Sequence, residues 1–398
     1  MVRLTRLAAL ATVLFVVPIF GDTFLVLPFA NLSKNTSIGW IGESVADTVR
    51  ETLSAGGVAA MDRLAREEAF KQLGIRQNVL LTRASMIKIA GALDADQVVY
   101  GDFELTPAPP PTTGGTRGSL RISAHVLDLK RMHQGPEFSE TGALEDLAML
   151  QTRIAWRTLS FLLGSAAPSE ADFLAAHPVV RLDAIESYVR GLMALSKEQR
   201  LRLLSQAVRL DPGFSQPYFR LGQLYYGQHE HKPAVEWLSK VKPSDAHFRE
   251  SLFLMGVSRY MLFEYAAAET LFQKLAADVP LANVLNNAGV AQSKQNSAEA
   301  FATLEKAIEA DPNDPIPRFN SGYVCWKQSL WAKAAERFRA VLDRDGNDAE
   351  AKQLLERCEK KIGPRLKDRL EIQERLKIEY EEAAYLQLKS VLQPNGKQ

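Results

Sequence analysis

Two histidines flank a glutamate at residues 229–231, and this triplet is the first place where the chain could hold a metal ion. His229 and His231 lie two residues apart, with Glu230 between them. A zinc site needs three or four ligands that converge on one point, and no further ligand stands near this triplet in the sequence. In the repeat pattern described below, the triplet falls between two helices. We therefore predict a polar turn there and no metal site.

A second group of candidate ligands consists of three carboxylates at four-residue spacing. The apolar residues around Glu43, Asp47 and Glu51 have helical spacing, which places the three acids on one face of a helix. Carboxylates in such a row could bind a cation. No acidic residue on a predicted strand joins them, however, and the pattern is typical of a solvated helix face, which is our prediction.

Neither phosphate binding nor nucleophilic catalysis is indicated elsewhere. Residues 113–119, TGGTRGS, lack the order of glycine, lysine and serine or threonine that forms a phosphate-binding loop before a helix, so a mobile turn is predicted. His125 falls in an alternating strand and His133 in a turn, and neither has a nucleophile within reach in the sequence. We predict no catalytic, cofactor-binding or metal-ligating residue and a protein that is not an enzyme.

The chain is long enough for two or three domains, and its charge argues against one class of partner. Its 398 residues carry a formal net charge of +1, with 46% hydrophobic and 24% charged residues. Basic and acidic residues are mixed along the chain rather than gathered in blocks. This charge pattern does not indicate a nucleic-acid partner.

The amino-terminal segment has the composition of an export signal. Arg3 and Arg6 precede an apolar run at residues 7–20, and Gly21 follows as the small residue of a cleavage site. The run is shorter than the roughly 20 residues that a membrane span needs. We expect a signal peptide over residues 1–21 and a periplasmic or otherwise exported protein. An uncleaved membrane anchor is the alternative, and only then would the protein be attached to a membrane.

Residues 22–164 alternate between predicted strands and helices. Between the last two strands lies a stretch rich in proline and glycine, which predicts a long exposed hairpin loop. The order β-α-β-α-β-β-α indicates one mixed sheet with helices packed on it. The expected strands cover residues 22–33, 58–62, 97–105 and 119–129, and the expected helices cover 38–54, 82–96 and 143–163.

Four stretches of this region resemble the TolB amino-terminal-like domain, which also occurs in FlgO-like exported proteins. They are FLVLPFANLS, IGWIGESVADTVRETLS, ALDADQVVYGDFEL and LRISAHVLDLK. The chain departs from the family pattern at Asp102, where a small residue is usual, and in the proline-rich loop. The resemblance implies a binding or assembly domain in the cell envelope.

A regular series of glycines marks the second half of the chain. The glycines that follow one another at nearly equal intervals are Gly191, Gly222, Gly256, Gly289 and Gly322. A period of about 33 residues indicates a stacked array of helix pairs. One pair cannot bury its faces alone, so neighbouring pairs stack into a superhelix.

Each repeat also has a small and a large residue at fixed distances from its glycine. Gly256 is followed by Ala268 and Phe272, and an alanine and a large apolar residue follow Gly222 and Gly322 at the same offsets. This pattern resembles the tetratricopeptide repeat. The resemblance implies about five repeats and a capping helix over residues 183–363, with the glycines where paired helices approach closely.

The remaining segments connect and close the array. Residues 165–182 are predicted as a linker. Cys325 and Cys358 fall in predicted helices, where we expect apolar residues without a bridge between them. Residues 364–398 predict one long charged helix followed by a tail, with two interpretations: the helix packs on the array, or it docks to a partner.

The expected fold is thus α/β plus all-α: a mixed-sheet domain, then a tetratricopeptide superhelix and a long carboxy-terminal helix. We expect a non-enzymatic exported adaptor or scaffold that needs no cofactor and binds proteins or peptides in its concave groove, within a cell-envelope assembly. The alternatives are a sensory or regulatory module of an envelope signalling system and an enzyme with an unrecognised site in the first domain.

In repeats of this kind the first helix of each pair lines the groove. The predicted groove residues are Phe219, Gln223, Tyr226, Phe253, Tyr260, Asn286, Lys294, Phe319, Tyr323, Trp326 and Lys327. The aromatic members either act as binding anchors or pack between the helices or against the final helix. If they are anchors, Tyr260→Ala with Trp326→Ala should abolish partner binding and leave the fold intact.

Overall fold

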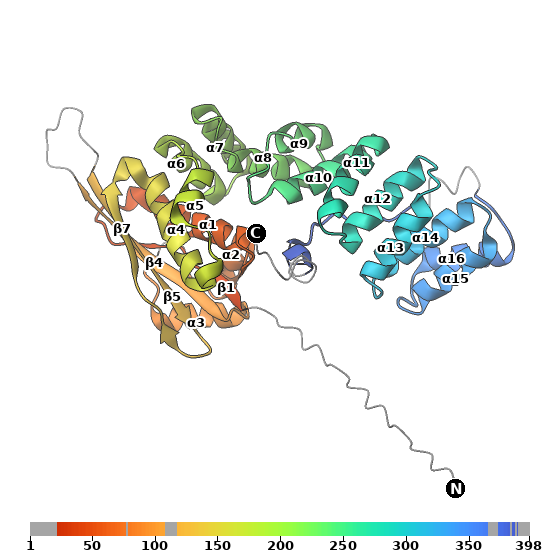
Figure 1. Ribbon diagram of the computed structural model, residues 1–398, viewed down its shortest axis with the longest axis horizontal. Coiled ribbons are helices and arrows are strands. Elements are labelled where there is room, and N and C mark those ends of the chain that lie inside the picture. Colours follow the sequence, from red (N-terminus) through yellow and green to blue (C-terminus); the bar gives the residue numbers. More distant parts are fainter. Residues whose placement is uncertain are drawn as a thin grey trace, which may run out of the picture.

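The computed structural model describes residues 22–76, 79–107, 118–364, 373–382, 384–386 and 388. The predicted signal peptide and most of the proline-rich loop lie outside these residues. A half that contains a sheet stands at one end of the molecule, and a curved row of helices extends from it (Figure 1).

The first half contains one mixed sheet, as predicted. Its strands are β1 (Thr23–Val26), β2 (Ala30–Asn31), β3 (Ala59–Ala60), β4 (Gln97–Pro107), β5 (Gly118–Asp128), β6 (His133–Gln134) and β7 (Phe138–Ala143). β4 and β5 form a long antiparallel hairpin at the centre. β1 and β2 run parallel to β4 on one side, with β3 beyond β1, while β6 and β7 pair antiparallel with β5 on the other.

Helices cover both faces of this sheet because side chains alternate along its strands. Val99 and Phe103 pack in the core under α1 (Trp40–Ala55) and α4 (Leu147–Leu163). Val98 packs in a second cluster under α2 (Arg63–Gln72) and α3 (Arg83–Ala92). The hydroxyl of Thr82 accepts a hydrogen bond from the amide of Ser85 (3.2 Å) and caps α3 as predicted. Helix α2 was not predicted.

The second half is an array of paired helices. Its members are α6 (Leu182–Met193), α7 (Lys197–Leu210), α8 (Gln216–Gly227), α9 (His231–Leu238), α10 (Phe248–Met261), α11 (Tyr265–Asp278), α12 (Ala282–Lys294), α13 (Ala300–Ala310), α14 (Pro315–Lys327), α15 (Trp331–Leu342) and the closing helix α16 (Ala349–Glu359). A Cβ atom on Gly256 would lie 2.7 Å from the ring of Phe272. Only glycine allows that approach, which confirms the predicted role of this position.

The same contact fixes the register of the whole array. Gly222 meets Leu238 and Gly322 meets Phe338 at the predicted spacing. In the two shorter repeats the partners lie nearer along the chain, so that Gly289 meets Leu304 and Gly191 meets Leu204. Both cysteines are buried and unbridged, as expected.

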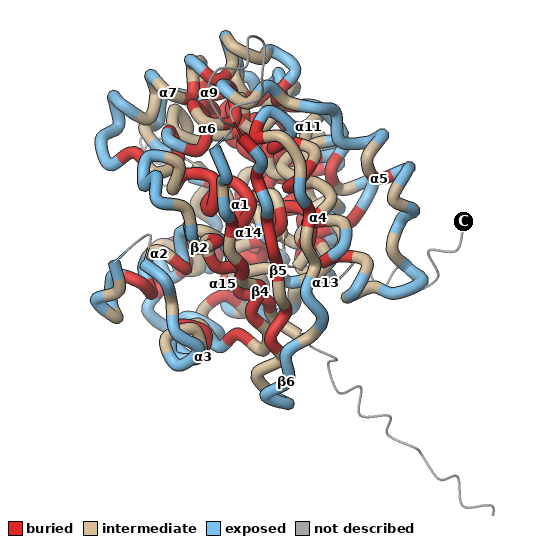
Figure 2. Tube along the Cα trace, turned by 90° about the vertical axis from the view of Figure 1, so that its left-hand side faces the viewer, coloured by how far each residue is buried: buried red, intermediate tan, exposed pale blue. Residues whose placement is uncertain are grey.

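The two halves share one hydrophobic core. The cluster around α1 and α4 continues through Tyr188 of α6 and Leu204 of α7 to Leu221 of α8. The predicted linker at residues 165–182 contains α5 (Glu170–Ala176), whose Phe173 is buried in the same cluster. Figure 2 shows buried segments of β4, β5 and α1, with exposed turns around them. The sheet and the array are therefore packed together.

The described part of the carboxy-terminal tail is extended where one long helix was predicted. Residues 373–381 adopt no helix, and helical residues appear only within 382–388. The backbone groups of residues 375–379 bond to side chains of the array instead of to each other, which replaces the hydrogen bonds of a helix. The predicted helix is wrong for residues 373–381, and its remaining length falls largely outside the described residues.

Candidate partner-binding groove

First helices of the array hold the extended tail by its main chain. Asn320 of α14 accepts a hydrogen bond from the amide of Arg375 (2.7 Å) and donates one to its carbonyl oxygen (2.8 Å). Asn287 of α12 makes the same two bonds with Lys377 (2.9 and 2.8 Å). A carboxamide that meets both groups of one residue imitates a neighbouring β-strand. This mode of recognition does not depend on the side chain of the bound residue.

Three further groove residues donate to carbonyl oxygens of the tail. They are Asn286 to Arg375 (3.0 Å), Asn283 to Glu379 (3.1 Å) and the hydroxyl of Tyr226 to Ile378 (2.8 Å). The tail thus runs from α14 back along the array, and its dark-blue helical turn lies close to α10 in Figure 1.

Glu374 lies in a pocket of positive charge. Its side chain is 1% exposed, and its carboxylate oxygens lie 2.7 Å from Lys294 Nζ and 3.5 Å from Lys327 Nζ. The hydroxyl of Ser293 donates to it at 2.7 Å. Burial by itself raises the pKa of this carboxyl, but the two lysines and the hydroxyl outweigh burial and lower the pKa of Glu374. The group is therefore ionised at neutral pH.

The neighbouring Arg375 lies in a pocket of the opposite charge. Its guanidinium carbon sits 3.5 Å from the centroid of the Phe319 ring. Its nitrogens pair with both carboxylate oxygens of Asp348 and with Glu350 at 2.7 Å. Ring stacking and paired carboxylates suit a planar guanidinium better than an ammonium group.

Contacts continue toward the end of the described tail. Lys377 Nζ pairs with Asp314 (2.7 Å), and the ring of Tyr380 packs on Phe253 with the centroids 5.5 Å apart. Arg249 pairs with Glu382 and stacks on the ring of Tyr385. The Tyr385 hydroxyl donates a hydrogen bond to Asp278 (2.6 Å). The groove therefore combines main-chain recognition with charged and aromatic pockets.

Predicted groove residues that bond or pack against the described part of the tail include Tyr226, Phe253, Asn286, Lys294, Phe319 and Lys327. The other five make contacts within the array. Phe219 stacks on His247, Gln223 accepts from Arg220, Tyr260 packs on Tyr265, Tyr323 packs on Trp326, and the indole of Trp326 donates to the carbonyl oxygen of Ile362.

Tyr260 and Trp326 are both buried in the structure, in which the tail occupies the groove. Trp326 is 0% and Tyr260 is 9% exposed. Alanine at both positions is now expected to destabilise the array, because truncating buried aromatic side chains leaves cavities that cost about 3–5 kcal/mol each. Trp326 packs between the helices, whereas Tyr260 lies in the apolar cluster that the array forms with residues of the tail.

Sequence reasoning missed the two asparagines that hold the main chain. Asn287 and Asn320 each stand two residues before the central glycine of their repeat, in the stretches NAG and NSG. Both are fully buried. A buried carboxamide needs a partner, so an asparagine at the same buried position of successive repeats was a usable signal. The predicted set took other positions of the helix.

The histidine triplet forms the predicted polar turn between α8 and α9. His229 and Glu230 are exposed, and His231 begins α9. His229 has a left-handed backbone (φ 59°), as the turn requires. Among the described residues, no three histidine, cysteine or acidic side chains are grouped so that they could hold a metal ion.

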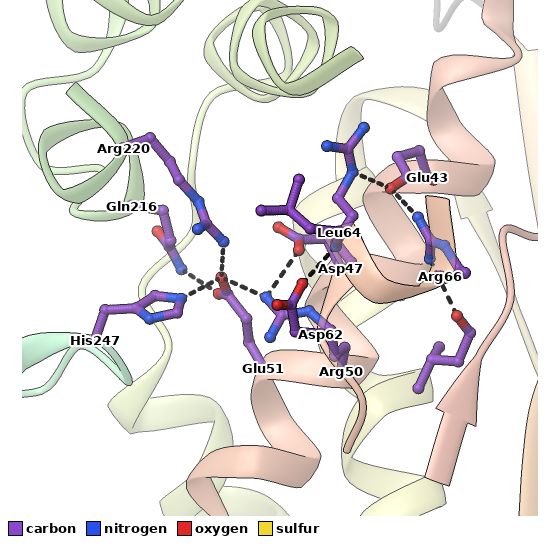
Figure 3. A network of polar contacts seen from close by, with 12 residues as sticks. Glu43, Asp47, Arg50, Glu51, Asp62, Leu64, Arg66, Gln216, Arg220 and His247 are labelled. Atoms are coloured by element: carbon purple, nitrogen blue, oxygen red, sulfur yellow. Dashed lines mark hydrogen bonds and ion pairs between the residues drawn. The ribbon is translucent and has the colours of Figure 1, made fainter. Parts of the chain in front are cut away.

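The three carboxylates of α1 are buried, so the prediction of a solvated helix face is wrong (Figure 3). Glu43 lies between Arg63 (2.6 Å) and Arg66, both from α2. Burying a carboxylate is costly unless a partner compensates. The helix that sequence reasoning missed supplies those partners.

Asp47 and Glu51 link α1 to the array. Asp47 accepts a hydrogen bond from the hydroxyl of Tyr188 on α6 (3.1 Å). Glu51 lies 3.2 Å from His247 Nε2 and 3.8 Å from Arg220 of α8 (Figure 3). These contacts reinforce the shared hydrophobic core with buried charges.

Residues 250–282, which include most of α10 and all of α11, match the tetratricopeptide repeat family. This helix pair is a tetratricopeptide repeat. The other four pairs place a large side chain against the central glycine in the same way, so the array is of the tetratricopeptide type. No curated protein matches the sequence. Within the described residues, no helix is long and apolar enough to cross a membrane.

Several solved structures are similar to part of the chain. MamA from Desulfovibrio magneticus RS-1 is 20% identical with a TM-score of 0.38, and the match covers 42% of this chain and 95% of that one. YrrB, described as a TPR protein with an unusual peptide-binding site, is 19% identical with a TM-score of 0.34 and a coverage of 48% and 93%. PilF from Pseudomonas aeruginosa is 20% identical with a TM-score of 0.37 and a coverage of 54% and 93%.

Proposed function

We propose that this protein is a non-enzymatic adaptor that holds an extended segment of a partner protein in the groove of its array. The observation that carries the proposal is the pair of carboxamides, Asn287 and Asn320, each closed on the amide and carbonyl of one tail residue. Main-chain bonds of this kind give affinity for an extended chain, while side-chain pockets give specificity. The tail stands in for the partner segment.

The tail and a partner compete for the same groove. Because the tail belongs to the same chain, its binding is intramolecular, and a free peptide meets a competitor at high local concentration. The adaptor is therefore closed at rest and opens when a stronger ligand replaces the tail.

We also propose that the adaptor works outside the cytoplasm, in a cell-envelope assembly. The support is the apolar run after Arg3 and Arg6, together with the resemblance of the first half to TolB-like exported domains. Intact-mass measurement of protein from the envelope fraction should give a chain without residues 1–21. A full-length mass in the cytosol would contradict this.

Fluorescence anisotropy with a labelled synthetic peptide of residues 373–388 tests peptide binding. The receptor is the full chain with Glu374→Lys and Arg375→Glu, which place like charges in both pockets and release the tail. We expect saturable binding to this variant and much weaker binding to the unsubstituted chain, whose own tail competes.

Two controls make the outcome decisive. Arg131→Glu changes an exposed turn of the first half and should bind the peptide as weakly as the unsubstituted chain. Trypsin cleavage at Lys377 reports that the tail has left the groove. If a released and folded chain binds no peptide, the groove is not a peptide site and the proposal fails.

A further inference from the structure

We infer that the groove selects partner segments with the charge order acid–base–x–base, which is the order of Glu374, Arg375 and Lys377 in the tail. The inference rests on the proposed function and names the class of peptide that the groove accepts. It follows from three successive pockets, each of which presents the charge opposite to the residue it holds.

The pocket that holds the acidic residue, Glu374, lies between two neighbouring repeats. Lys294 comes from α12 and Lys327 from α14, and the carboxylate between them is almost fully shielded from water. Lys327 also donates to the carbonyl oxygen of Ser293 (2.9 Å), which fixes its position. A basic residue here would bring three positive charges together in a site largely shielded from water, and this mismatch costs more than the same contact on an open surface.

The pocket that holds the first basic residue, Arg375, is built from the start of the closing helix α16. Asp348 caps α16 by accepting a hydrogen bond from the amide of Ala351 (3.0 Å), and its carboxylate also receives the Arg375 guanidinium. The Asp348 side chain is 6% exposed, so this is not a solvated surface pair. An acid at this position would face the carboxylates of both Asp348 and Glu350.

The pocket that holds the second basic residue, Lys377, contains Asp314, which caps the start of α14. One oxygen of Asp314 accepts a hydrogen bond from the amide of Ile316 (2.9 Å), and the other lies 2.7 Å from Lys377 Nζ. The Asp314 side chain is 10% exposed. Between the two basic positions, Leu376 packs against the apolar cluster of α10 to α12. The three pockets thus read an order of charges and not merely a net charge.

Peptide variants on one receptor test this order. The receptor is again the released full chain, and the labelled peptides cover residues 373–388 with the native sequence or with Glu374 and Arg375 exchanged. Both peptides have the same composition and net charge. We expect the exchanged peptide to bind at least about tenfold more weakly, because like charges would meet in two pockets. The receptor is identical in both measurements, so its folding cannot account for a difference.

A double-mutant cycle tests the second basic pocket. Asp314→Asn removes the charge but keeps a side chain that can cap α14. On the receptor with Asp314, the peptide with Lys377→Met should bind several-fold more weakly than the native peptide. On the Asp314→Asn receptor, the two peptides should bind nearly equally well.

The outcomes separate the inference from the proposed function. Equal binding of the native and exchanged peptides, or no coupling between Asp314 and Lys377, would overturn the charge order while leaving peptide binding in place. Failure of the native peptide to bind the released chain would instead remove the proposed function itself.

Discussion

The ammonium group of Lys294 lies 2.7 Å from the carboxylate of Glu374, and Lys327 approaches the same carboxylate from the next repeat. One acid of the tail therefore joins two first helices, α12 and α14. Its single negative charge also offsets part of the repulsion between the two lysines in the groove. The tail is thus part of the structure that stabilises the last repeats.

Glu374→Gln should loosen the tail without changing its shape. The substitution leaves two half-buried lysines, 22% and 27% exposed, without their counter-charge, so its cost lies below the about 3–5 kcal/mol of a fully buried ion pair. We expect the amides of Arg375 and Lys377 to exchange with deuterium at least tenfold faster. Glu381→Gln, on an exposed residue of the same tail, is the control and should leave both rates unchanged.

Acid should release the tail. The lysines outweigh burial and lower the pKa of Glu374, and hydrogen bonds from Arg375 lower the pKa of Asp348. A carboxyl whose pKa is lowered by folding stabilises the folded form above its unfolded pKa, about 4.5 for glutamate, and this contribution is lost as pH falls through the folded value. Susceptibility of the tail to pepsin should rise between about pH 5 and 3. Glu374→Gln should flatten that rise.

Alkaline pH should weaken the junction between α1 and the array. Burial lowers the pKa of His247, but hydrogen bonds with Glu250 and Glu51 outweigh it, and the pKa is raised. A histidine with a raised folded pKa stabilises the fold below its unfolded pKa, about 6.5, and this stability is lost as pH rises through the folded value. We expect Tm to fall above about pH 6.5. His247→Gln should remove this dependence, while His229→Gln, in an exposed turn, should retain it.

Gly256→Leu should destabilise the array. A Cβ there already meets the Phe272 ring at 2.7 Å, and overpacking of this kind typically costs about 1–3 kcal/mol. Gly227→Ala is the matched control, because a Cβ at Gly227 meets no atom within 4 Å. Thermal unfolding followed by circular dichroism should show a lower Tm for the first variant only. An unchanged Tm for Gly256→Leu would mean that the paired helices do not depend on this contact.

The repeat register was predictable because its cause is local. Two helices joined by a short turn must approach closely, and that requirement places glycine and a large residue at a fixed spacing. Strand β1 was also predictable from its apolar run, β5 from side-chain alternation and α3 from the cap at Thr82, whereas β6 and β7 were not predicted. The apolar pattern of a strand and the capping residue of a helix both lie within a few residues of the element they specify.

The conformation of the tail was not predictable in this way. Its many glutamate, lysine and leucine residues favour a helix, yet Arg375 and Lys377 find main-chain partners on Asn320 and Asn287, far away in the sequence. The burial of the acid face on α1 has a similar cause, since its cationic partners come from α2 and α8. Tertiary contacts decide both cases, and no short window of sequence contains them.

The shared core of the two halves has a consequence for how such an adaptor would arrange its ligands. Domains joined by a flexible linker let their ligands wander relative to each other, whereas a large apolar interface suppresses that motion. Here the cluster under α1 and α4 runs into α6, α7 and α8, and Glu51 adds charged contacts to His247 and Arg220. A peptide held in the groove would therefore sit at a fixed distance and angle from the sheet. The protein would then act as a rigid spacer within an assembly and not as a flexible connection.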